Sequence, residues 1–280
     1  MKILLVGSSG FIGSHILRKL ENKHTVIKFS LRDGFDMSIW DDVEKACADA
    51  NAIFHFGATA VGRRNATPDP HFADTDYSGV RNFVRAAEMF HIPLIFSSSI
   101  RVYGTTEEMK GGEDGDVHPT SVYGQMKLDC ENIIKNSAAQ WIILRIAAVY
   151  GKGMPEDFII SSFCRTISRG EPIILTSTGQ QKRNFVCAED LAECISLLAD
   201  YTFEKNEIIN VAHHETVNLL ELIKLIGGIL GKKVDVRPAH VDTKDPDELI
   251  SIRKVEKLLG WRAKTDLVRG LERCYAHEIF

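Results

Sequence analysis

A tyrosine, a lysine and a run of serines are the residues of this chain whose types and spacing best suit proton transfer. Ser97, Ser98 and Ser99 close an apolar run, and Tyr123 and Lys127 follow in a helical pattern. Residues four apart lie on one face of a helix, so the ammonium group can sit beside the phenol. The cation stabilises the phenolate and lets the tyrosine act as a base toward a hydroxyl group. We therefore expect a catalytic set of Ser99, Tyr123 and Lys127.

The spacing of this pair is common, so its meaning depends on what precedes it. Tyr201 and Lys205 have the same spacing, but no hydroxyl-rich strand end lies ahead of them. The pair at 123 and 127 follows the serine cluster at the end of a predicted strand. Context therefore favours this pair as the catalytic one.

Three glycines near the first residue indicate a phosphate-binding loop. Gly7, Gly10 and Gly13 separate an apolar run at 2–6 from a helical pattern at 11–20. In a strand–turn–helix unit such glycines permit a tight turn, a close backbone approach to phosphates and close helix packing. The N-terminus of the following helix attracts an anion. The pattern predicts binding of a dinucleotide pyrophosphate.

The two patterns together predict reversible oxidation of a carbinol with a nicotinamide dinucleotide. Tyr123 would remove the hydroxyl proton while hydride leaves the same carbon. Ser99 would hold the substrate oxygen, and Lys127 would also bind the nicotinamide ribose. Tyr123 and Lys127 are therefore expected to bind the cofactor as well as to catalyse.

The end of the second predicted strand, 25–29, bears on the choice between NAD and NADP. Ser30 and Arg32 could accept a 2′-phosphate, which favours NADP. Alternatively, these residues form a solvated turn and Asp33 or Asp36 binds the ribose hydroxyls. We expect NAD or NADP, with NADP favoured.

Other residues are placed to border the cofactor. Asp36 and Met37 precede a predicted helix at 39–48 and lie where the adenine is expected. Gly57 and Ala58 follow the third strand, and ligands of open α/β sheets bind beyond such strand ends. His55 stands between two phenylalanines inside that strand, so we interpret it as a core residue.

Apolar and amphipathic runs alternate along the first half of the chain, which predicts an α/β fold with a Rossmann-type doubly wound parallel sheet. We place a dinucleotide-binding domain at 1–151. Residues 152–280 are expected to form mostly a smaller, interleaved substrate-binding domain, with some segments returning to the first. Predicted strands are 2–6, 25–29, 93–97, 141–147, 173–175 and 208–211, with another from 51; predicted helices are 11–20, 39–48, 77–90, 121–136, 158–169, 189–198 and 219–230.

Composition narrows the partners and the compartment. The 280 residues are 44% hydrophobic and 26% charged, with a net charge of −4, which favours neither nucleic acid nor an anionic membrane as partner. No apolar run reaches the roughly 18 residues of a membrane span. Six scattered cysteines without a CxxC pair indicate reduced thiols in the cytoplasm and no metal site.

Further motifs stand at 55–58, 97–104, 144–151, 183–190, 209–211 and 259–261. With these, nearly the whole chain resembles the extended short-chain dehydrogenase/reductases of the NAD-dependent epimerase/dehydratase family, best known for modifying nucleotide sugars. The resemblance implies that Phe11 and Ile12 join the cofactor site. It also implies that Arg183 contacts the substrate diphosphate.

Several positions depart from that family. Ala148 stands where nucleotide-sugar enzymes usually carry asparagine, and the usual Arg-Pro-Gly-Asp motif is absent. Lys244, near the place of that motif, could supply a charge to the substrate. Ile100 and Arg101 replace the Asp-Glu pair of the 4,6-dehydratases, so dehydration is not expected.

The function expected is a nucleotide-sugar epimerase that transiently oxidises a carbinol carbon. The alternatives are an NADP-dependent reductase or dehydrogenase of a keto-sugar or other carbonyl, and a non-catalytic nucleotide sensor on the same scaffold. The resemblance implies a homodimer formed through helices 77–90 and 121–136. Ile133 and Ile134 could face either the partner or the core.

Overall fold

The apolar runs build a six-stranded sheet whose strands are all parallel. A computed structural model describes residues 1–58, 70–104, 112–202, 204–239 and 247–275. The strand order is β2-β1-β3-β4-β5-β9. From β1, the chain first adds β2 on one side and then β3 to β9 on the other, and doubly wound sheets bind ligands at such a switch point. The strands are β1 (Lys2–Val6), β2 (Thr25–Phe29), β3 (Ala52–His55), β4 (Leu94–Ser99), β5 (Trp141–Ile146) and β9 (Glu207–Val211). The predicted fold class is confirmed.

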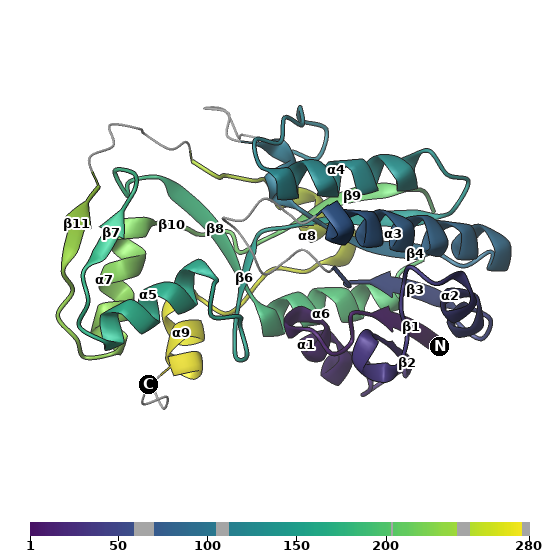
Figure 1. Ribbon diagram of the computed structural model, residues 1–280, viewed down its shortest axis with the longest axis horizontal. Helices are drawn as coiled ribbons and strands as arrows, with labels where there is room; N and C mark the ends of the chain where they lie inside the picture. Colours follow the sequence, from purple (N-terminus) through teal and green to yellow (C-terminus); the bar gives the residue numbers. More distant parts are fainter. Residues whose placement is uncertain (59–69, 105–111, 203, 240–246, 276–280) are drawn as a thin grey trace.

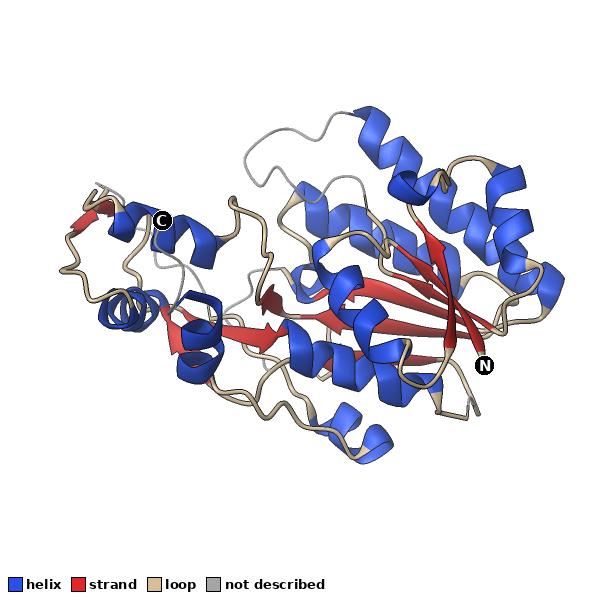
Figure 2. Ribbon diagram, turned by 90° about the horizontal axis from the view of Figure 1, so that it is seen from below, coloured by secondary structure: helices blue, strands red, loops and turns tan. Residues whose placement is uncertain are grey.

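Helices cover both faces of this sheet (Figure 2). In β1, Ile3 and Leu5 enter the core shared with α1 and α6, whereas Leu4 and Val6 enter the core shared with α2, α3 and α4. Burial on both faces explains why the strand is apolar at consecutive positions. The helices are α1 (Phe11–Leu20), α2 (Trp40–Cys47), α3 (Pro70–Phe90), α4 (Val122–Lys135) and α6 (Ala188–Ala199).

A smaller part of the chain lies beyond one end of the main sheet and has its own core (Figure 1). It holds a three-stranded sheet, β10-β8-β6, and a parallel pair, β11-β7. The chain returns from it to the main sheet through α6, β9 and α8. Its elements are β6 (Ala148–Tyr150), α5 (Ile159–Ser168), β7 (Ile173–Leu175), β8 (Lys182–Cys187), β10 (Thr216–Asn218), α7 (Leu219–Ile229), β11 (Val236–Pro238) and α9 (Leu267–Tyr275), and α8 is Arg253–Leu259.

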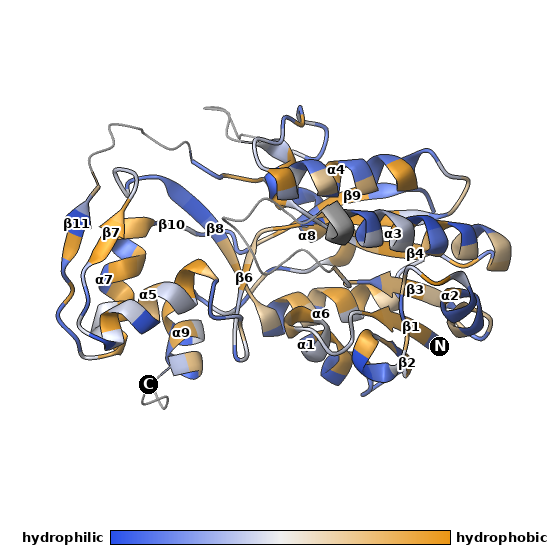
Figure 3. Cartoon of the chain, in the orientation of Figure 1, coloured by the Kyte–Doolittle hydropathy of each residue, from blue (hydrophilic) through white to orange (hydrophobic). Residues whose placement is uncertain are grey.

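Hydropathy follows these layers: β1 and β3 are mostly hydrophobic, whereas the flanking helices carry residues of both kinds (Figure 3).

No helix within the described ranges is long and apolar enough to cross a membrane. Among the described residues, no three His, Cys, Asp or Glu side chains gather in a way that could hold a metal ion. All six cysteines are free, and burial raises the pKa of Cys47 and Cys187 to about 12.

Candidate functional site

The glycine-rich loop closes the C-terminal end of β1 against the end of β3. Gly7 has a φ of +81°, in the left-handed region that glycine adopts freely. A Cβ atom on Gly7 would lie 2.7 Å from Cα of Gly57, and one on Gly13 would lie 2.0 Å from the carbonyl oxygen of Gly7. Both positions exclude a side chain, which leaves a backbone cradle suited to phosphate groups. Ala58 follows Gly57 beyond the end of β3 and is half-buried.

Helix α1 begins at this loop with an uncapped N-terminus. Its N-cap residue, Gly10, provides no side-chain hydrogen bond, and the first turn has no acidic residue. The first N–H groups of a helix have no partner within it. Here they include those of Phe11, Ile12 and Gly13. The terminus and its partial positive charge therefore suit an anion such as a pyrophosphate.

The carboxylate of Asp33 links the end of β2 to the glycine-rich loop. Its Oδ2 accepts hydrogen bonds from the hydroxyls of Ser8, at 2.8 Å, and Ser30, at 2.5 Å. Arg32 is exposed. A 2′-phosphate next to Ser30 would meet the negative charge of Asp33. The geometry therefore does not support the NADP preference expected from Ser30 and Arg32.

Asp36 and Met37 form the turn ahead of α2. Asp36 Oδ1 accepts hydrogen bonds from the backbone N–H and the hydroxyl of Ser38, at 2.9 and 2.8 Å. The carbonyl of Met37 accepts a hydrogen bond from Asn82 Nδ2 on α3, at 3.0 Å. The turn is thus fixed between α2 and α3, and its contact with an adenine stays a prediction.

Helix α4 begins against the turn that follows β4. Ser121 caps the helix, because its Oγ accepts a hydrogen bond from the N–H of Gly124 at 3.1 Å. A Cβ atom on Gly124 would lie 2.5 Å from the carbonyl oxygen of Arg101, so the missing side chain permits this contact. The N–H of Arg101 donates to Ser99 Oγ at 3.2 Å. The first turn of α4, which carries Tyr123, therefore packs on the turn that carries Ser99.

Lys127 lies one helical turn beyond Tyr123 and is buried, with 4% of its surface exposed. Its Nζ donates a hydrogen bond to the carbonyl oxygen of Ser97 at 2.9 Å and lies 4.8 Å from the centre of the Phe96 ring. Burial and the nearby charge of Lys127 lower the pKa of His55 to about 3, so this histidine is neutral. The structure confirms His55 as a core residue; the catalytic roles of Ser99, Tyr123 and Lys127 stay predictions.

A buried ion pair, missed by sequence reasoning, anchors α4 to the sheet. Glu131 accepts hydrogen bonds from the guanidinium of Arg145 on β5 and from the hydroxyl of Ser98, at 2.6 Å. The Arg145 guanidinium also lies 4.7 Å from the centre of the Tyr103 ring. Two signals could have revealed the pair: Glu131 stands four residues beyond Lys127 on the same helix face, and Arg145 interrupts an apolar strand.

The expected substrate residues are only partly described. Arg183 lies on β8, and its Nε is 3.6 Å from Oε1 of Glu248. The same oxygen lies 2.6 Å from Nη1 of Arg101. Ala148, on β6, pairs with β8 in the small sheet. Lys244 lies outside the described residues.

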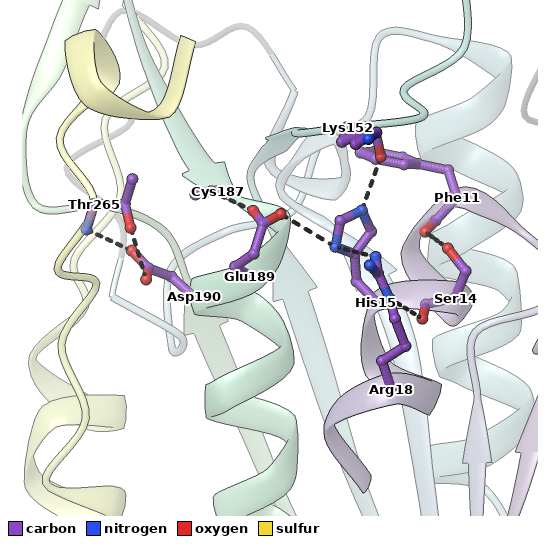
Figure 4. A network of polar contacts seen from close by, with 9 residues as sticks. All are labelled: Phe11, Ser14, His15, Arg18, Lys152, Cys187, Glu189, Asp190 and Thr265. Atoms are coloured by element: carbon purple, nitrogen blue, oxygen red, sulfur yellow. Dashed lines mark hydrogen bonds and ion pairs between the residues drawn. The ribbon is translucent and has the colours of Figure 1, made fainter. Parts of the chain in front are cut away.

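A polar network joins α1 to segments that lead into and out of the smaller part (Figure 4). His15 Nε2 lies 2.9 Å from the carbonyl oxygen of Lys152, and Nδ1 lies 3.1 Å from Arg18 Nη2 and 3.4 Å from Glu189 Oε1. Because a carbonyl only accepts, Nε2 carries the hydrogen in the contact with Lys152. The thiol of Cys187 donates to Glu189 Oε2 at 2.7 Å. These contacts connect α1 to α6.

Comparison with known proteins gives one consistent result. The model of the NAD dependent epimerase/dehydratase family matches residues 3–212. The chain is 25% identical over 313 residues to a UDP-glucose 4-epimerase of Vibrio cholerae, covering 97% of this chain and 93% of that one. Its fold is similar to that of UDP-glucose 4-epimerase from Thermotoga maritima with UDP-glucose (TM-score 0.85, 24% identity, 98% and 97% covered). Its fold is also similar to that of UDP-glucuronic acid 4-epimerase from Bacillus cereus in complex with UDP-glucuronic acid and NAD (TM-score 0.87, 23% identity, 98% of both chains).

Proposed function

Because the chain belongs to the NAD dependent epimerase/dehydratase family, we propose that it is a nucleotide-sugar epimerase acting by transient oxidation of a carbinol carbon. The observation that carries this proposal is the packing of Gly124 against the backbone of Arg101, which brings Tyr123 to the turn of Ser99. Relatives named as UDP-sugar 4-epimerases favour a uridine diphosphate sugar as substrate and its C4 as the reacting carbon.

The glycine-rich loop fits a dinucleotide. Side chains are excluded at Gly7 and Gly13, and the first N–H groups of α1 are left for a pyrophosphate. The nicotinamide of such a cofactor supplies a reversible hydride acceptor when bound. Phe11, Ile12, Gly57 and Ala58 line the same strand ends and complete this proposed cofactor site.

The chain's own residues then have defined tasks. Ser99 binds the sugar hydroxyl through a hydrogen bond, and Tyr123 takes its proton as the carbon is oxidised. Lys127, oriented by the carbonyl of Ser97, stabilises the negative charge of the tyrosine. The keto sugar then rotates in the site and presents its other face. Tyr123 returns the proton to the oxygen as the carbon is reduced on that face. These steps invert the configuration of one carbon without any further acid or base.

We further propose NAD rather than NADP as the cofactor. Asp33 stands at the end of β2, where an acidic residue can accept hydrogen bonds from both ribose hydroxyls. Ser8 and Ser30 donate to its Oδ2 and so orient the carboxylate. The proposal also agrees with the NAD named in the complex of the Bacillus cereus enzyme.

A test of the function follows UDP-glucose and UDP-galactose by nuclear magnetic resonance while the absorbance of the reduced cofactor is recorded. An epimerase interconverts the two sugars with no net change in that absorbance. A reductase or dehydrogenase changes the absorbance in proportion to the substrate converted. A nucleotide sensor binds without turnover.

We also propose a homodimer formed through α3 and α4. Tyr77 on α3 donates a hydrogen bond to Asp129 on α4 at 3.0 Å. Ile134 is fully buried and belongs to the core, whereas Ile133 is half-buried. Between the helices lies a shallow hollow of about 350 Å³, lined by Tyr77, Arg81, Asp129, Asn132, Ile133 and Asn136. Asn132→Trp fills this hollow, and light scattering after size-exclusion chromatography would then show a shift toward the monomer.

We likewise propose that the main sheet and the smaller part bind different ligands. The main sheet would hold the dinucleotide, and the smaller part would hold most of the substrate, as its Arg183 suggests. Six free cysteines, five of them buried, support residence in a reducing compartment such as the cytoplasm.

A further inference from the structure

Two arginines and one glutamate meet beside the turn that follows β4. Oε1 of Glu248 lies 2.6 Å from Nη1 of Arg101 and 3.6 Å from Nε of Arg183. The side chain of Glu248 is 5% exposed, that of Arg183 14% and that of Arg101 43%. A nearly buried carboxylate therefore lies between two cations, one of which reaches solvent.

The position of this cluster is set by its neighbours. The N–H of Arg101 donates to Ser99 Oγ, the group proposed to hold the reacting oxygen. Arg183 is the residue proposed to contact the diphosphate. A sugar joined to that diphosphate, with its reacting oxygen at Ser99, must pass between them. Glu248 therefore borders the expected path of the sugar.

The backbone around Glu248 is held to β8 by hydrogen bonds. Its N–H donates to the carbonyl oxygen of Lys182 on β8 at 2.8 Å. On one side, Asp247 Oδ1 accepts a hydrogen bond from the N–H of Lys182 at 2.7 Å, and on the other the N–H of Ile250 donates to Asn184 Oδ1 at 3.1 Å. With both flanks bonded, Glu248 has little freedom to withdraw from an incoming ligand.

We infer that Glu248 makes the sugar subsite selective for hexoses with an uncharged C6 substituent over uronic acids. This inference rests on the proposed function. With Arg183 engaged by the diphosphate, Arg101 and Glu248 form a neutral pair whose charged groups can exchange hydrogen bonds with sugar hydroxyls. A uronate would bring a second carboxylate next to a nearly buried one, where like charges repel strongly. Glu248 also competes with that carboxylate for Arg101.

Calorimetric binding of UDP, UDP-glucose and UDP-glucuronate to the full chain tests this inference. The wild type should bind UDP-glucose at least about tenfold more tightly than UDP-glucuronate, since an unscreened like-charge contact of this kind exceeds that factor. Glu248→Gln should bring the two affinities to within about threefold, and the affinity for UDP alone reports separately any change at Arg183. Glu272→Gln, an exposed change on α9, is the matched control and should keep the wild-type ratio.

A second variant separates the roles of the pair. Arg101→Met leaves Glu248 without its nearest cation and should weaken UDP-glucuronate further relative to UDP-glucose. A wild type that prefers UDP-glucuronate would overturn the inference, since Arg101 would then be a uronate receptor; an unchanged ratio in Glu248→Gln would overturn it too. Because each ratio is measured within one variant, partial unfolding does not alter it. If UDP itself does not bind, the proposed function fails, and the inference with it.

Discussion

The guanidinium of Arg145 donates two hydrogen bonds to the carboxylate of Glu131, from Nε to Oε1 at 3.0 Å and from Nη2 to Oε2 at 2.8 Å. Arg145 is 2% exposed and Glu131 is fully buried. Glu131 lies on α4, one turn beyond Lys127, and Arg145 lies on β5 beside β4. This two-point contact therefore holds the helix that carries Tyr123 and Lys127 in a fixed orientation over the strand that ends at Ser99.

Glu131→Gln tests the importance of this pair for stability. The substitution leaves the charge of Arg145 buried without its counter-ion, and breaking such a pair costs about 3–5 kcal/mol. We expect a loss of that size in the free energy of unfolding, measured with urea. Glu272→Gln should change it by less than about 0.5 kcal/mol. Equal stabilities of the two variants would show that the pair does not anchor α4.

Gly13→Ala tests the backbone cradle. The added Cβ would lie 2.0 Å from the carbonyl oxygen of Gly7, so the loop must shift. We expect the affinity for NAD, measured by calorimetry, to fall more than about tenfold, with a stability loss of about 1–3 kcal/mol. Gly228→Ala is the control, because nothing lies within 4 Å of its Cβ and α7 should gain about 0.5–1 kcal/mol. If Gly13→Ala binds NAD with wild-type affinity, the loop is not part of the cofactor site.

The sequence predicts the main sheet well because its signals are local. Five apolar runs that alternate with helical patterns correspond to β1 to β5, and the loop at Gly7 is recognisable from the spacing of three glycines. Gly124 is different, since its role depends on Arg101, which is distant in the chain and lies on another element. Periodicity cannot report such a contact.

The electrostatic partners were harder still to predict. Ser30 and Arg32 favour NADP when only neighbouring residues are considered, but the fold directs Ser30 and Ser8 toward Asp33. Glu248 reaches Arg101 and Arg183 only because β8 and a segment about 65 residues later lie side by side. The strands β6, β8 and β10 were not predicted, because their sequences carry no run as apolar as that of β7, which was predicted at 173–175.

His55 makes stability depend on pH. Its pKa is about 3 in the folded chain, against an ordinary value of 6.5 in the unfolded chain. Below pH 6.5 the unfolded state therefore binds a proton that the folded state excludes. The free energy of unfolding should then fall as the pH decreases from 6.5 toward 3, by up to about 1.4 kcal/mol per pH unit from this group.

Urea unfolding of the wild type and of His55→Gln between pH 7.5 and about pH 4.5 checks this expectation. The difference in stability between the two proteins should shrink in the acid range, because glutamine does not titrate. Carboxylates titrate equally in both proteins and cancel in the difference. A difference independent of pH would mean that His55 has the same pKa in the folded chain as in the unfolded chain.

Asp33→Ala tests the choice of cofactor. Loss of a carboxylate that accepts ribose hydrogen bonds should weaken NAD binding by about tenfold to a hundredfold. The same change removes a negative charge near a 2′-phosphate, so NADP binding should improve. Arg32→Ala should alter either affinity by less than about threefold, because that side chain is exposed at the rim. Tight NADP binding that Arg32→Ala abolishes would contradict the assignment of NAD.

The measurement that tests the account most directly is turnover of UDP-glucose by Tyr123→Phe, followed by nuclear magnetic resonance with NAD present. Removing the phenolic hydroxyl takes away the group assigned to move the sugar's hydroxyl proton, so turnover at saturating NAD should fall by a factor of about 100 or more. Tyr201→Phe is the matched control, because Tyr201 also stands four residues before a lysine and should keep wild-type turnover. Turnover of Tyr123→Phe equal to that of the wild type would contradict the proposed mechanism.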